Sequence, residues 1–252
     1  MIITDEVWGD IPLLHITSEQ MLDDAPVVIF MHGFMSAKEH NLHYAYQMVR
    51  KGVRVILPDA YLHGARSKNL SEAQMNVQFW PIVLQSIKEM GVISEQLVQK
   101  GFLTSNKIGI AGSSMGGITT SACLTVYDWI DAAAICMGVT SVTKLAQAQL
   151  EQFKAAGVTF EMSEADQQTL NTVLAQFDLE NKSTILNEVP VIFWHGVNDP
   201  IVPFKLSYPF YEKQKDEGYA KKSEFIVDKN AAHAVSRAGI LQVTSWLADH
   251  LA

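Results

Sequence analysis

Short apolar runs alternate along this chain with longer segments whose apolar residues recur at helical spacing. Runs that are apolar almost throughout are typical of strands buried on both faces of a sheet. The runs predict strands over residues 11–16, 26–31, 53–59, 107–111, 130–139, 190–194 and 223–227. The segments between them predict helices over residues 42–51, 71–90 (with a break or a start at Pro81), 118–129, 145–155, 163–177, 204–217 and 236–251. Alternation of this kind predicts an α/β fold, with a mostly parallel sheet covered by helices on both faces.

Residues 140–188 depart from the simple alternation. They contain two of the predicted helices, with Gly157 between them, and only a weak strand candidate at residues 158–160. We therefore expect a single domain over residues 1–252, in which residues 140–188 form a helical cap inserted between strands and lying over the strand ends.

The strand that begins at Lys107 leads into the sequence GSSMG (residues 112–116), and a helical segment follows at once. Gly-x-Ser-x-Gly between a strand and a helix is typical of a nucleophile elbow, a tight turn that lifts the serine hydroxyl above the sheet edge. The positions two residues to either side must be small, because strand and helix approach closely there. Glycines occupy both positions around Ser114, whereas Met115 would flank Ser113. The pattern therefore predicts Ser114 as the nucleophile.

A serine nucleophile needs a base, and the base needs an acid to orient it. After a nucleophile elbow the chain order is serine, acid, histidine. His233 lies between the last predicted strand and the last helix and is the predicted base, and Asp199 leaves the strand before and is the predicted acid. Asp228 is the alternative acid, although it ends the strand that leads into the histidine loop. A purely structural interpretation, in which Asp199 caps a turn and His233 is an ordinary loop residue, has to treat the order of three strand-end residues as chance.

Acyl transfer also needs donors for the developing oxyanion, normally two backbone amides. Met115, directly after the nucleophile, is the first predicted donor. Phe34, in the loop after the strand at residues 26–31, is the second. The side chain of His32 is expected to hold this loop in place rather than to transfer protons.

Three further residues, His32, His63 and Trp80, are candidates for lining the substrate pocket. His63 and Arg66 belong to a polar loop at the same sheet edge and could meet an acidic group of a substrate. The interpretation that we favour for Arg66 is structural, an ion pair with Asp59 that fixes the loop. Trp80 has the alternative of being an ordinary core residue.

The composition and charge of the chain restrict the kinds of partner that it can bind. The chain has 252 residues, of which 48% are hydrophobic and 18% charged, and its formal net charge of −8 argues against nucleic acid or an acidic membrane surface as a partner. No apolar run reaches the roughly 18 residues needed to span a bilayer, and the N-terminal residues lack a signal-peptide pattern. We expect a cytoplasmic protein, with Cys123 and Cys136 as reduced core residues. Monomer and homo-oligomer both stay open.

These motifs together resemble the α/β-hydrolase superfamily, in the branch around dienelactone hydrolases and prolyl-oligopeptidase catalytic domains. Within it, the chain is similar to small bacterial carboxylesterases of the YjfP type. The resemblance rests on residues 32–34, 58–60, 63–66, 78–80, 112–116 and 195–203, which extend over most of the chain. Its catalytic positions fall on Ser114, Asp199 and His233, and its oxyanion amides on Phe34 and Met115. The resemblance implies no metal and no organic cofactor.

The resulting prediction is a serine carboxylesterase that hydrolyses short-chain carboxylic esters, as a small-molecule substrate, through an acyl-enzyme intermediate. Dienelactone hydrolases carry cysteine at the elbow, so Ser114 argues against that activity. A thioesterase, or a deacylase of acylated sugars or amides, would use the same triad and is the first alternative. A binding module without catalytic activity on a hydrolase fold is the second.

Overall fold

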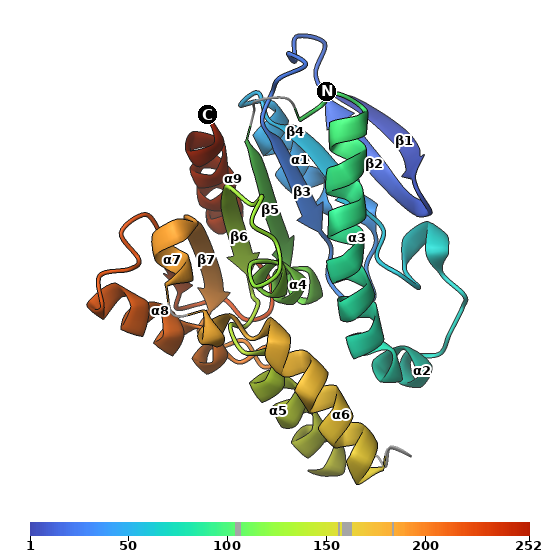
Figure 1. Ribbon diagram of the computed structural model, residues 1–252, viewed down its shortest axis with the longest axis vertical. Helices are drawn as coiled ribbons and strands as arrows, with labels where there is room; N and C mark the ends of the chain where they lie inside the picture. Colours follow the sequence, from blue (N-terminus) through green and yellow to red (C-terminus); the bar gives the residue numbers. More distant parts are fainter. Residues whose placement is uncertain (104–106, 156, 158–162, 183) are drawn as a thin grey trace.

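An eight-stranded sheet forms the centre of the computed structural model, which describes residues 1–103, 107–155, 157, 163–182 and 184–252 (Figure 1). The strand order is β1-β2-β4-β3-β5-β6-β7-β8. The strands are β1 (Ile2–Trp8), β2 (Ile11–Thr17), β3 (Val27–Met31), β4 (Arg54–Pro58), β5 (Ile108–Ser113), β6 (Ala132–Cys136), β7 (Val191–Gly196) and β8 (Glu224–Asp228). β1 and β2 run antiparallel to their neighbours, whereas β3 to β8 are parallel. The predicted mostly parallel sheet is confirmed.

Helices cover both faces of the sheet, as the pattern predicts. They are α1 (Leu42–Val49), α2 (Glu72–Val77), α3 (Phe79–Gln99), α4 (Met115–Cys123), α5 (Val142–Ala155), α6 (Glu164–Leu174), α7 (Ile185–Glu188), α8 (Tyr208–Asp216) and α9 (Arg237–Leu251). One core cluster contains side chains of α1 and α9, and the other contains side chains of α3, α4 and α8. In the parts of the chain that the structure describes, no helix combines the length and the apolar character that crossing a membrane requires.

The central strand β3 shows why its sequence is apolar throughout. Val27, Ile29 and Met31 point into the cluster under α3 and α4, whereas Val28 and Phe30 point into the cluster under α1 and α9. Successive side chains of a strand alternate between the two faces of a sheet. With helices on both faces, every position of β3 is buried, and the strand is held in the middle of the molecule.

Each of the seven predicted strands is present, but the pattern does not predict the edge strand β1. Five of its first six residues are exposed, so the strand does not show the alternation of apolar and polar positions that marks a half-buried strand. The predicted helix at residues 71–90 is two helices, α2 and α3. Pro81 lies in the first turn of α3, where its missing N–H breaks no helical hydrogen bond. The elbow helix α4 starts at Met115, three residues earlier than predicted, and ends at Cys123.

The segment predicted as a cap lies between β6 and β7. Its helices α5 and α6 lie side by side beyond the carboxyl ends of β5 to β7 (Figure 1). Hydrogen bonds close the base of this helix pair: the Thr143 N–H donates to Asp178 Oδ1 at 3.0 Å, and the Glu180 N–H donates to the Thr140 carbonyl at 3.1 Å. The weak strand candidate at residues 158–160 lies outside the described residues.

Candidate active site

Ser114 occupies the turn between β5 and α4 in a backbone conformation that non-glycine residues rarely adopt. Its φ is 55° and its ψ is −120°. The turn is held by a 2.9 Å hydrogen bond from the Ser114 N–H to the Cys136 carbonyl on β6. The flanking glycines are required by space: a Cβ at Gly112 would lie 2.4 Å from the Gly116 carbonyl carbon, and a Cβ at Gly116 would lie 2.2 Å from the Met31 oxygen. The close approach predicted around Ser114 is therefore present in the structure.

Three predicted residues meet in one hydrogen-bonded chain. Ser114 Oγ lies 2.8 Å from His233 Nε2, and His233 Nδ1 lies 2.7 Å from Asp199 Oδ2. A carboxylate can only accept, so Nδ1 carries the proton, and Nε2 of the neutral ring is free to accept from the serine hydroxyl. The order serine, base, acid is the arrangement that activates a serine nucleophile. The three residues follow β5, β7 and β8, whose carboxyl ends share one edge of the sheet.

Asp199 is fully enclosed by donors. Its Oδ1 accepts from the backbone N–H groups of Ile201 and Val202, both at 2.9 Å, and its Oδ2 lies 3.4 Å from His195 Nε2 in addition to its bond with His233. Burial alone would raise the pKa of Asp199, but the hydrogen bonds from both histidines and both amides outweigh it and hold the pKa well below the usual value. Asp199 is therefore a carboxylate that can keep the His233 ring in one orientation. The alternative acid, Asp228, instead accepts from the backbone of its own loop.

The two predicted oxyanion donors belong to residues beside the serine turn. Met115 is the first residue of α4, where an N–H has no partner inside the helix. Phe34 follows Gly33, whose Cα packs so closely on the elbow that a Cβ there would lie 3.4 Å from Ser114 Cβ. Within the described residues, neither the Phe34 N–H nor the Met115 N–H has a hydrogen-bond partner. Two free N–H groups beside Ser114 can bind an oxyanion.

Two buried histidines link the Phe34 loop to the loop after β4. The Ala60 N–H donates to His32 Nε2 and the Met35 N–H donates to His63 Nε2, each at 3.0 Å. The other ring nitrogens, both Nδ1, donate to backbone carbonyls, which requires both rings to be neutral. Burial lowers the pKa of His32 to about 4 and also lowers the pKa of His63. The expected loop-holding role of His32 therefore agrees with its contacts.

His32 and His63 do not line the pocket that contains Ser114, so their assignment as pocket residues is wrong. Both nitrogens of each ring are hydrogen-bonded to backbone groups, and both side chains are almost completely buried. The expected ion pair between Arg66 and Asp59 is also wrong. Arg66 binds Glu89 of α3 through both guanidinium ends, at 2.7 and 2.8 Å, and reaches only the backbone carbonyl of Asp59. The Asp59 carboxylate instead accepts from Lys38, a partner that sequence reasoning missed.

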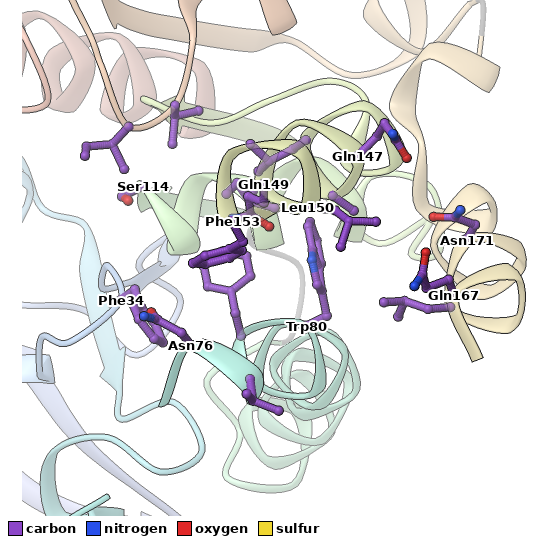
Figure 2. Close-up of a pocket in the computed structure, with 18 residues that line it drawn as sticks. Phe34, Asn76, Trp80, Ser114, Gln147, Gln149, Leu150, Phe153, Gln167 and Asn171 are labelled. Carbon is purple, nitrogen blue, oxygen red and sulfur yellow. The ribbon is translucent and has the colours of Figure 1, made fainter. Parts of the chain in front are cut away.

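The third pocket candidate, Trp80, does line the pocket, a cavity of about 250 Å³ that opens beside Ser114 (Figure 2). Phe34 and Phe79 line it as well, together with Gln149, Leu150 and Phe153 of α5. The α5 residues were not predicted individually. The signal that could have found them is an amphipathic helix in a segment inserted at the carboxyl ends of the strands. The inserted helices thus form one wall of the cavity.

Comparisons with known proteins identify a family and several relatives of this chain. The model of the prolyl oligopeptidase family matches residues 85–252. The chain is 40% identical to "Putative esterase YitV" of Bacillus subtilis (strain 168), over 99% of both chains, and 27% identical to esterase YjfP of Escherichia coli (strain K12), over 96% of both. Among solved structures, TT1662 from Thermus thermophilus superimposes with a TM-score of 0.79 at 18% identity, covering 100% of this chain and 99% of that one.

The predicted α/β-hydrolase fold and the predicted enzyme class are both confirmed by these matches. The family match covers two thirds of the chain and includes the elbow, the acid loop and the histidine loop. This chain is a hydrolase that belongs to the prolyl oligopeptidase family.

Proposed function

We propose that the chain is a serine carboxylesterase that hydrolyses short-chain carboxylic esters. The observation that carries the proposal is the continuous hydrogen-bonded chain from Ser114 Oγ through His233 to Asp199, with distances of 2.8 and 2.7 Å. These distances are within the range in which a base can take a proton from a hydroxyl without rearrangement.

In the proposed reaction, Ser114 Oγ attacks the ester carbonyl carbon while its proton passes to His233 Nε2. The ester C–O bond then breaks, and His233 gives the proton to the departing alcohol oxygen. Water attacks the resulting acyl-enzyme in the same way, with His233 again as the base, and releases the acid and free Ser114. Asp199 stays ionised throughout and stabilises the imidazolium that forms in each step.

The carbonyl oxygen becomes negatively charged in both tetrahedral intermediates. The N–H groups of Phe34 and Met115 are proposed to bind it, since both lie beside Ser114 and neither is used elsewhere in the described structure. Loss of one such donor costs about 10²–10³ in turnover in comparable enzymes. The histidine links of the Phe34 loop keep the Phe34 N–H in position before the substrate arrives.

Two further observations support an ester of limited size. Both curated relatives carry the name esterase, and we extend that activity to this chain. The cavity of about 250 Å³ is small for a ligand site, since such pockets usually measure about 300–1,000 Å³. Long acyl chains and peptides would not be enclosed by it.

Turnover of para-nitrophenyl butanoate by Ser114→Ala tests the proposal, with Ser113→Ala as the matched control. Ser114→Ala should lose about 10⁴–10⁶ in kcat, because within the described residues Ser114 has the only hydroxyl bonded to His233. Ser113→Ala should keep its kcat within about threefold, because the hydroxyl of Ser113, a half-buried residue at the end of β5, has no part in the proposed reaction. Equal turnover by Ser114→Ala and the wild type would refute the proposal. The same panel, run with a thioester and an anilide of butanoic acid, separates an esterase from a thioesterase or an amidase.

A further inference from the structure

Aromatic side chains from three separate segments wall the cavity beside Ser114. Phe34 comes from the loop after β3, Phe79 and Trp80 from the first turn of α3, and Phe153 from α5. The rings of Phe34 and Phe79 are 5.3 Å apart at 70°, and those of Phe79 and Trp80 are 5.1 Å apart at 87°. Edge-to-face contacts of this kind leave ring faces and edges that a further aromatic ring can join, at a gain of about 0.5–1.5 kcal/mol beyond burial.

The view in Figure 2 shows how these rings are placed. Ser114 and Phe34 lie at one end of the pocket, Phe153 and Trp80 in its middle, and the amide side chains of Gln167 and Asn171 at the other end. A group attached to an ester carbonyl at Ser114 would therefore meet the aromatic side chains first.

Trp80 also has a polar group that the protein does not use. The residue is 8% exposed, and its Nε1–H, which has no hydrogen-bond partner within the described residues, is not sealed off from the cavity that Trp80 lines. The N–H of a largely buried tryptophan usually bonds to a partner, so this group can donate to a ligand in the cavity. The half-buried amide side chains of Asn76 and Gln149, on the same cavity, likewise have no hydrogen-bond partner in the part of the chain that the structure describes. The aromatic wall is thus combined with unused donors.

Charge is absent from this wall. Among the described residues that line the cavity, none is Asp, Glu, Lys or Arg. An ionised group on the substrate would lose its hydration there without gaining a counter-charge, which is costly. The lining therefore favours an uncharged group.

Building on the proposed esterase function, we propose that the pocket selects esters that carry one uncharged aromatic ring with an oxygen substituent, and that Trp80 Nε1–H donates a hydrogen bond to that oxygen. The ring belongs to either the acid or the alcohol half of the ester, because both extend from the same carbonyl at Ser114. In this proposal Phe79 and Phe153 contact the ring, and Trp80 recognises its oxygen substituent through the hydrogen bond from Nε1–H.

The test compares matched esters in steady-state kinetics. One pair consists of the methyl esters of para-methoxyphenylpropanoic and para-ethylphenylpropanoic acid, which differ by one oxygen in place of a CH₂ group. A second pair carries the same rings in the alcohol half, as phenethyl acetates. Methyl butanoate is the aliphatic reference. In one of the two pairs, the wild type should favour the methoxy ester over its ethyl counterpart by about five- to tenfold in kcat/KM, the equivalent of one hydrogen bond.

Trp80→Phe keeps a ring but removes the N–H, so the ratio of methoxy to ethyl ester should fall to about one in that variant. Trp246→Phe on α9, which is outside the pocket lining, is the matched control and should keep the wild-type ratio. Phe79→Leu should reduce the preference for aryl over aliphatic ester by about tenfold. Each ratio is measured within one variant, so a general loss of activity does not affect it.

The outcomes separate the inference from the proposed function. If the wild type hydrolyses methyl butanoate but does not favour the methoxy ester over the ethyl ester in either aryl pair, the inference is refuted and the esterase proposal stands. A methoxy preference that survives in Trp80→Phe would refute the role of the indole N–H. Failure to hydrolyse any of the five esters would refute the esterase function, and the inference with it.

Discussion

Replacing His32 by glutamine should make the stability of the protein less sensitive to acid. His32 is 1% exposed, and its two ring nitrogens require the neutral form, since the Ala60 N–H donates to Nε2 and Nδ1 donates to the Gly33 carbonyl. A glutamine oxygen can accept from the Ala60 N–H in place of Nε2, but it does not titrate. The substitution therefore removes the proton-binding group with limited change to the loop.

The size of the effect follows from the pKa. Burial lowers the pKa of His32 from 6.5 to about 4, so between these values the unfolded chain binds a proton that the folded chain excludes. Keeping His32 neutral costs no free energy of unfolding above the pKa of the unfolded chain. As the pH falls from that value towards the pKa in the folded protein, the free energy of unfolding decreases. At 1.36 kcal/mol for each pKa unit, the full loss is about 3 kcal/mol, most of which falls between about pH 8 and about pH 4.5.

Urea unfolding of the wild type and His32→Gln at these two pH values measures the difference. His15, His43 and His63 also have lowered pKa values, so the wild type and the variant should both lose stability in acid. The wild type should lose about 2–3 kcal/mol more than His32→Gln. If the two proteins lose the same free energy of unfolding, His32 is not held neutral by its two backbone contacts, and the argument about the loop is refuted.

Three further predictions concern the site. Asp199→Asn should lower kcat on a short ester by about 10⁴ with the far-UV circular dichroism unchanged, because the His233 ring loses the acceptor that fixes its tautomer; a loss below about tenfold would contradict this. Gly116→Ala should lower the free energy of unfolding by about 3 kcal/mol or more, because its Cβ would meet the Met31 carbonyl, and an unchanged melting temperature would show that the turn has room. His63→Ala removes the acceptor of the Met35 N–H, so kcat should fall by about ten- to hundredfold with little change in KM, whereas a raised KM at constant kcat would place His63 in substrate binding.

The meeting of Ser114, Asp199 and His233 could be predicted because it depends on local signals and one rule of topology. The GSSMG sequence places Ser114 after β5, and Asp199 and His233 follow β7 and β8. Parallel strands bring their carboxyl ends to one edge, so residues that are up to 119 positions apart in the chain come within hydrogen-bond distance. No detailed packing was needed to bring them together.

Side-chain partners within the loops could not be predicted in the same way. Arg66 binds Glu89 because α3 packs over the loop after β4, and Asp59 is left to Lys38 from the loop after β3. The sequence contains several residues of suitable charge to pair with Arg66 or Asp59, and only the packing of helices on the sheet determines which of them pair. The edge strand β1 was missed for a related reason, because an exposed strand carries no alternating pattern.

The pocket wall depends on the part of the chain with the weakest sequence signal. Residues 140–188 predict helices, and an amphipathic pattern can indicate an apolar face of α5, but it does not show that this face lies beside Ser114. The structure turns Gln149, Leu150 and Phe153 towards the cavity. Substrate preference is therefore a question for the structure, whereas the reaction type is already indicated by the order of the strand-end residues.

Labelling with a fluorophosphonate, followed by peptide mapping in a mass spectrometer, tests the central claim most directly. The reagent reacts with a serine only where a base activates the hydroxyl and amides bind the phosphonyl oxygen. The account predicts one adduct in the wild type, on Ser114, which persists in Ser113→Ala and is absent in both Ser114→Ala and His233→Ala. An adduct on Ser113, or equal labelling of the wild type and His233→Ala, would contradict it.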